Sequence, residues 1–164
     1  FRGILRLRVN FQKNTAEIRS LAVSKKMKSL DPKIIAFEVK SEVDRLFERP
    51  FNTHDFLNTL FKAYHRLRTE SSNVVLLKDV HRLLWMGKQK EGFFETSNPK
   101  QLIPYPIDEF SVDLGKLLES KDRSLSSGYI CRLSLGSGGV NIYNPSGDFN
   151  AYKYIEFVKG GKDD

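Results

Sequence analysis

The chain has 164 residues, 40% of them hydrophobic and 29% charged, which is the composition of a globular domain with one core. No apolar run approaches the roughly 20 residues that a transmembrane helix needs, and the lone cysteine, Cys131, excludes an internal disulfide and a Cys-rich zinc site. The net charge of +7 is uneven, because residues 1–90 carry 19 Lys and Arg against 9 Asp and Glu, whereas residues 91–164 carry 8 against 11; such a basic half favours a polyanion such as nucleic acid as the partner.

The first predicted element is a β-strand over residues 1–11. Its apolar side chains, among them Leu7 and Val9, alternate with Arg6 and Arg8. This alternation predicts a strand with one buried face and one face that carries arginines into solvent. Alternate side chains on a strand stand about 7 Å apart, close to the phosphate spacing along a nucleic-acid strand. The alternative is that the arginines only keep the strand soluble.

The following segments are a polar link at residues 12–15, an apolar stretch at residues 16–23 that fits either helix or strand, and a basic loop at residues 24–29. The loop has three lysines within four positions: Lys25, Lys26 and Lys28. Like charges this close repel one another unless an anion neutralises them, and a phosphate backbone would do so. We therefore interpret the loop as part of a nucleic-acid contact.

Two helices follow, each with a recognisable start. Asp31 and Pro32 suit the N-cap and the first position of a helix whose apolar residues recur at spacings of four and three, and Pro50 ends it. Asn52 or Thr53 can cap the second helix, which has a broad apolar face.

A third helix is predicted from Leu76 to about Gln89. Basic residues lie on its outer side or just beyond its end: Lys78, Arg82, Lys88 and Lys90. An amphipathic helix can present such a basic patch to a groove of nucleic acid, although the same pattern is common on merely solvated helices. Residues 92–105 are expected to be irregular, and this segment is longer than an ordinary connection.

A fourth helix is predicted to begin at Pro106, with Asp108 and Glu109 in the first turn, where the helix dipole favours acidic side chains. Beyond it, alternating residues predict a three-stranded meander with turns at Gly136–Gly139 and Asn144–Asp148. Together with the strand at residues 1–11, the meander would form a mostly antiparallel sheet of about four strands covered by about four helices. The expected fold class is α+β, with residues 1–164 as a single domain.

The sharpest catalytic hypothesis rests on Glu38 and Lys40. At the end of an apolar strand, Glu-x-Lys is typical of a restriction-type nuclease, in which carboxylates bind Mg²⁺ and the lysine stabilises the attacking hydroxide or the phosphate. Such a site also needs an upstream aspartate, and the chain offers none before Asp31, which is better used as a helix cap. Because the same residues also fit a helix, the nuclease stays an alternative.

Two weaker signals concern the last third of the chain. Gly136–Gly139 could cradle a phosphate through backbone amides, but a hairpin turn accounts for it more simply because no helix with a Lys or Ser/Thr partner follows. The tyrosines of the closing strands could stack on bases, although alternating aromatic residues are more often shared between core and surface.

The chain resembles the carboxy-terminal domain of the TnsE family, target-selection proteins of a bacterial cut-and-paste transposon, in three segments: Leu76–Trp85, Tyr105–Leu118 and Asn144–Asp148. The resemblance implies one domain of a longer protein, which agrees with a first residue other than Met. It implies binding to DNA with recessed 3′ ends, as arise during replication, contact with the replication processivity clamp, and recruitment of core transposition proteins. Gln101–Tyr105 is a poor copy of a clamp-binding peptide, so we expect the clamp contact to lie outside this chain.

The sequence therefore predicts a cytoplasmic, DNA-binding domain without catalysis, cofactor or metal, which chooses DNA by backbone and structure rather than by sequence. Its expected phosphate contacts are Arg2, Arg6, Arg8, Lys25, Lys26, Lys28, Lys78, Arg82, Lys88 and Lys90. The alternatives are the Mg²⁺-dependent nuclease and a protein-docking module with an acidic partner on the basic face.

Overall fold

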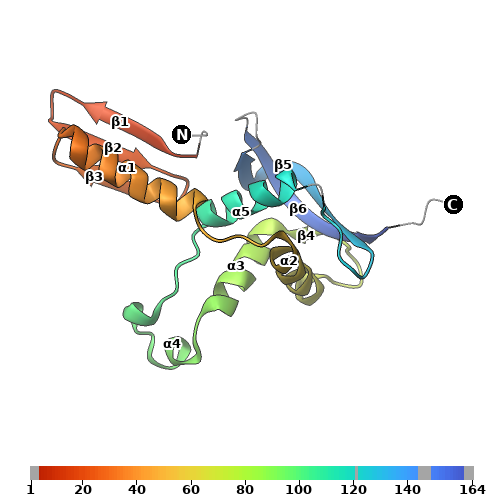
Figure 1. The fold of residues 1–164 in the computed structure, drawn as a ribbon. Coiled ribbons are helices and arrows are strands. Elements are labelled where there is room, and N and C mark those ends of the chain that lie inside the picture. The colour runs from red at the N-terminus through yellow and green to blue at the C-terminus, as the bar shows by residue number, and fades with distance from the viewer. Residues whose placement is uncertain (1–3, 121, 144–148, 161–164) are drawn as a thin grey trace.

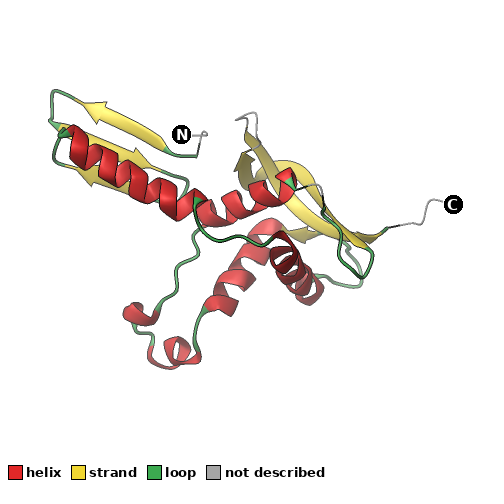
Figure 2. Ribbon diagram, viewed as in Figure 1, coloured by secondary structure: helices red, strands yellow, loops and turns green. Residues whose placement is uncertain are grey.

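The computed structural model describes residues 4–120, 122–143 and 149–160 (Figure 1). Helices and strands form an α+β fold, as predicted. Figure 2 shows them in two groups, which we call the first and the second lobe; each has its own small sheet. No helix within the described ranges is long and apolar enough to cross a membrane. Arg2 and the turn predicted at residues 144–148 lie outside these ranges.

The first lobe is a three-stranded antiparallel sheet with one helix packed against it. Its elements are β1 (Arg6–Asn10), β2 (Thr15–Arg19), β3 (Ser24–Met27) and α1 (Pro32–Phe47). Asp31 caps α1 as predicted, because its carboxylate accepts the backbone N–H of Lys33 at 2.8 Å. Ile18, Met27 and Leu46 are buried between the sheet and the helix.

Two predictions for this lobe are wrong. Residues 24–27 are not a loop but the strand β3, which pairs with β2. The apolar side of β1 is not buried either, since Leu7 is 47% and Val9 37% exposed. The reason is that α1 packs over β2 and β3 and leaves β1 at the open edge of the sheet (Figure 1). All residues of β1 are exposed, and burial is limited to Ile4 and Leu5, just before the strand.

The second lobe packs three helices on another antiparallel sheet. The helices are α2 (Thr53–Leu67), α3 (Leu77–Lys88) and α5 (Ile107–Glu119), and the strands are β4 (Val75–Leu76), β5 (Tyr129–Tyr143) and β6 (Phe149–Lys159). The strand order is β4-β6-β5. Asn52 caps α2, as expected, by accepting the N–H of Asp55 at 3.0 Å. The single four-stranded sheet expected from sequence is therefore wrong, because β1 pairs with its neighbour in the chain and never reaches β5 or β6.

The predicted meander is also wrong in its first turn. Strand β5 continues through Gly136–Gly139, and both Leu135 and Val140 lie opposite Tyr152, so the four residues between them form a bulge. A Cβ atom on Gly139 would lie 2.2 Å from the carbonyl oxygen of Tyr152. The glycine is thus required by the close approach of the two strands.

We expect Gly139→Ala to lower the free energy of unfolding by about 2 kcal/mol, because the added methyl group must push the Tyr152 backbone aside. Denaturant titration monitored by circular dichroism would measure this loss. Ser137→Ala is the matched control, since Ser137 lies exposed in the same bulge. Equal stability of the two variants would contradict the observed strand approach.

Residues 89–105 are more ordered than predicted. They include a short helix, α4 (Glu91–Thr96), and a 3-10 turn, η1 (Pro99–Gln101). The buried side chain of Gln89 joins the two ends of this segment. Its amide group donates to Ile103 O at 2.8 Å and accepts from Ile103 N at 2.9 Å.

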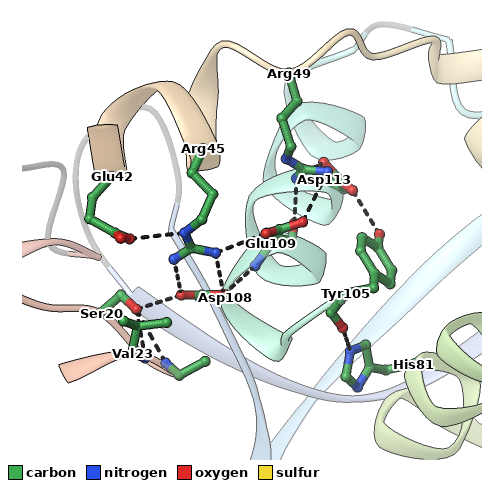
Figure 3. Close-up of polar contacts among 11 residues, drawn as sticks. Ser20, Val23, Glu42, Arg45, Arg49, His81, Tyr105, Asp108, Glu109 and Asp113 are labelled. Carbon is green, nitrogen blue, oxygen red and sulfur yellow. Dashed lines mark hydrogen bonds and ion pairs between the residues drawn. The ribbon is translucent and has the colours of Figure 1, made fainter. Parts of the chain in front are cut away.

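Helix α5 connects the two lobes. Val112 is buried in the first lobe's core, whereas Phe110 and Leu114 are buried in the second. The acidic first turn of α5 also faces α1, where Arg45 reaches into it (Figure 3). The junction is therefore made by one helix that is apolar on two sides and acidic at its start.

The Arg45 guanidinium is surrounded by three carboxylates. It donates to Asp108 at 2.7 Å, to Glu109 at 2.9 Å and to Glu42 at 2.9 Å. The fully buried Asp108 also accepts the hydroxyl of Ser20, from the loop after β2. Burial alone would raise the pKa of Asp108, but the hydrogen bonds from Arg45 and Ser20 outweigh it and hold that pKa below its ordinary value.

A second group of polar contacts continues along α5 (Figure 3). Arg49 pairs with Asp113 at 2.8 Å, and the hydroxyl of the buried Tyr105 donates to Asp113 at 2.7 Å. The backbone carbonyl of Tyr105 accepts from His81 Nε2 at 2.7 Å, which makes Nε2 the protonated ring nitrogen. Burial lowers the pKa of His81, so its ring stays neutral. These contacts hold α5 against the segments that carry Arg49, Tyr105 and His81.

Candidate nucleic-acid interface

The register of the first sheet gathers basic side chains on the side away from α1. Arg6 lies opposite Arg19, and Arg8 lies opposite Glu17, which in turn lies opposite Lys26. Because side chains alternate along a strand, all of these residues share one side of the sheet. The buried Ala16, Ile18 and Met27 take the other side, against α1. We call the four exposed cations the outer face: Arg6, Arg8, Arg19 and Lys26.

A single carboxylate lies among these cations. Glu17 pairs with Arg19 at 2.8 Å and accepts the Ser24 hydroxyl at 2.7 Å. Hydrogen bonds from Arg19 and then from Ser24 lower the pKa of Glu17, so it stays ionised. Arg6 and Arg8 make no side-chain hydrogen bond or ion pair within residues 4–120, 122–143 and 149–160. The outer face therefore keeps an excess of positive charge.

The predicted contacts of the first lobe separate into two groups. Arg6, Arg8 and Lys26 meet on the outer face. Lys25 points to the opposite side, where it pairs with Glu38 of α1, and Lys28 is exposed beyond the end of β3. The alternation that separates Lys25 from Lys26 exists only because these residues form a strand.

Sequence reasoning misses Arg19. The stretch at residues 16–23 fits either helix or strand, so its side chains could not be assigned to a face from sequence alone. The strand β2 puts Arg19 beside Arg6. The alternation of Glu17 and Arg19 with apolar residues is the signal that would have found it.

The second predicted patch is not one patch. Lys78 and Arg82 of α3 line a shallow hollow with Trp85, and Arg82 pairs with Asp79 at 3.1 Å. Lys88 lies on another side of the helix, with its Nζ 4.4 Å from the centre of the Tyr105 ring. Lys90 precedes α4 and lines a third hollow. The four residues thus lie on three different surfaces.

The nuclease hypothesis requires Glu38 and Lys40 at the end of a strand, but the structure has a helix there. Glu38 and Lys40 lie in α1, two positions and so about 200° apart around its axis. Glu38 pairs with Lys25, and Lys40 pairs with Asp44 at 2.8 Å. In the part of the chain that the structure describes, no three or more His, Cys, Asp or Glu side chains cluster as metal ligands would. The strand interpretation of residues 34–40 is therefore wrong.

The aromatic residues of the closing strands belong mainly to the core. Tyr129 and Phe157 both pack on Phe61 of α2, with ring centres 5.1 Å and 5.0 Å away. Phe157 is buried and Tyr129 partly buried, so packing in the core accounts for these two rings.

Comparison with models of known protein families gave no match, and no curated protein or solved structure proved similar to this chain.

Proposed function

We propose that this chain is a DNA-binding domain that recognises DNA through its phosphate backbone and structure. The observation that carries the proposal is the outer face, where Arg6, Arg8 and Lys26 are exposed on a sheet whose other side is covered by α1 over β2 and β3. Phosphate contacts of this kind supply affinity and little base reading. No catalytic role is needed for this function.

The geometry of a small sheet suits a row of phosphates. Arg6 and Arg8 are two positions apart on one strand, hence about 7 Å apart, and adjacent strands lie about 4.8 Å from each other. Arginine can also donate two parallel hydrogen bonds to one phosphate. The outer face can therefore neutralise two or three neighbouring phosphates at once.

The resemblance to the TnsE family extends this proposal to a biological role. We propose that the domain serves transposition target selection in the cytoplasm, by binding replication-associated DNA with recessed 3′ ends. The processivity clamp and core transposition proteins would then be partners of other parts of the same protein.

A binding titration against ionic strength tests the proposal. Fluorescence anisotropy would compare blunt duplex, single-stranded and recessed-end DNA between about 50 and 200 mM salt. We expect log affinity to fall by about two to three units per log unit of salt, one for each phosphate neutralised. Absence of DNA binding at about 0.1 M salt would contradict the proposal and favour an acidic protein as the partner of the outer face.

A further inference from the structure

The second lobe has a groove between α2 and α3. Its volume is about 500 Å³, within the range of pockets for small molecules. One side is a face of α2 that includes Thr59 and Ala63, and the other is the end of α3 around Leu84. The buried Tyr105 contributes to the lining. We call this hollow the α2–α3 groove.

The groove combines an apolar floor with a basic rim. Ala63, Leu84 and Tyr105 are all buried and form the floor. Lys62 and Arg66 lie one helical turn apart on α2, and both are exposed.

The rim cations have few partners of their own. Lys62 and Arg66 make no side-chain hydrogen bond or ion pair in the described part of the chain, while Lys88 faces the Tyr105 ring across the groove. The lining has two carboxylates: Asp113 is already bound by Arg49, and the exposed Asp55 offsets one of the three positive charges. Three cations around one hollow repel one another, and an anion with several charges would relieve that repulsion.

Gly87, an exposed residue next to the end of α3, lines the groove. It lies inside the helix without the positive φ that would require glycine, and a Cβ atom built there meets nothing within 4 Å. Glycine at such a position weakens a helix, and neither the backbone conformation nor close packing requires it here. Free space for a ligand would explain its presence.

We propose that the α2–α3 groove binds a nucleoside phosphate. The flat base would lie in the groove over Ala63 and Leu84, and the phosphate would be bound by Lys62, Arg66 and Lys88. An acidic peptide fits less well, because its single charges are spread along the chain, whereas three cations here converge on one compact hollow. A free nucleotide and an unpaired nucleotide within a DNA strand offer the same chemistry, and the experiment below distinguishes them.

The site lies in the other lobe from the outer face, so the two proposals can fail separately (Figure 1). Isothermal titration of the intact chain would use ADP, a short single-stranded oligothymidine and a blunt duplex as three separate probes. We expect saturable binding of ADP or of the oligothymidine. ADP binding identifies a free nucleotide as the ligand. If ADP does not bind, oligothymidine binding that Gly87→Leu weakens identifies a nucleotide within a strand, because binding of the oligothymidine through the outer face would be the same in both proteins.

Gly87→Leu is the decisive variant, because Gly87 lines the groove, where a leucine side chain would take up space that a ligand needs, and leucine is a better helix former than glycine. We expect affinity for the bound probe to fall at least about tenfold, while the Tm rises by about 2 °C. Met86→Leu, at an exposed neighbouring position outside the groove, is the matched control and should change neither property. Duplex binding through the outer face should be equal in all three proteins.

The proposal is overturned if the unmodified chain binds neither ADP nor the oligothymidine, or if Gly87→Leu binds them as the unmodified chain does. Lys62→Glu gives an independent measurement, because it reverses a charge on the rim and leaves the apolar floor of the groove unchanged. We expect a similar loss of affinity for the bound probe. A chain that binds ADP but no duplex would leave this site standing and remove the proposed DNA-binding function instead.

Discussion

Replacing Arg6, Arg8 and Lys26 together by glutamine lowers the affinity for DNA by at least about 100-fold at low salt, if the outer face is the phosphate contact. The same change reduces the slope of log affinity against log salt by about three, one for each cation removed. Glutamine is preferable to glutamate, because the register puts Arg8 and Lys26 directly opposite Glu17, where a further carboxylate would repel it. Loss of binding can then be separated from loss of the sheet.

The matched control removes three exposed cations elsewhere. Arg68, Lys100 and Lys159 lie outside the first lobe and make no side-chain ion pair in the described ranges. Their replacement by glutamine changes the net charge equally, so any general electrostatic effect appears in both proteins. Equal loss of affinity in the two triple variants would show that net charge, and not the outer face, holds the DNA. Unchanged affinity in both would refute the site.

Arg45→Met has the largest expected effect on stability. The substitution leaves Asp108 fully buried and deprived of its main partner, while Glu42 and Glu109 stay close to it. Removing one partner of a buried ion pair costs about 3–5 kcal/mol, which for a chain of this size lowers the Tm by about 10 °C. Thermal unfolding followed by circular dichroism would measure the change.

A double variant separates the charge from the shape of the side chain. In Arg45→Met with Asp108→Asn, the uncompensated buried charge is gone, so we expect part of the lost stability to return. Lys40→Met serves as the exposed control, since its ion pair with Asp44 lies in solvent, and it should leave the Tm nearly unchanged. A small effect of Arg45→Met, similar to that of Lys40→Met, would mean that the junction does not depend on this cluster.

The cluster also shows why a charge pattern can be misread. Sequence reasoning explains Asp108 and Glu109 by the helix dipole, which any acidic first turn would satisfy. The structure adds Arg45 and Arg49, about sixty residues earlier in the chain, as their partners. A long-range ion pair leaves no periodic signal, so neither side of it stands out in the sequence.

Helices α1, α2, α3 and α5 and the α+β class could be predicted from sequence because their signals are local, whereas α4 was not predicted. Asp31 and Asn52 cap helices within three residues of themselves, and alternation marks Arg6 and Arg8 as neighbours on one side of a strand. Only the tertiary structure decided which strands pair, that Gly139 lies in a bulge rather than a turn, and that Lys25 and Lys26 point to opposite sides. Each of these depends on contacts between distant residues, and a strand's face has no meaning until its partner and its covering helix are in place.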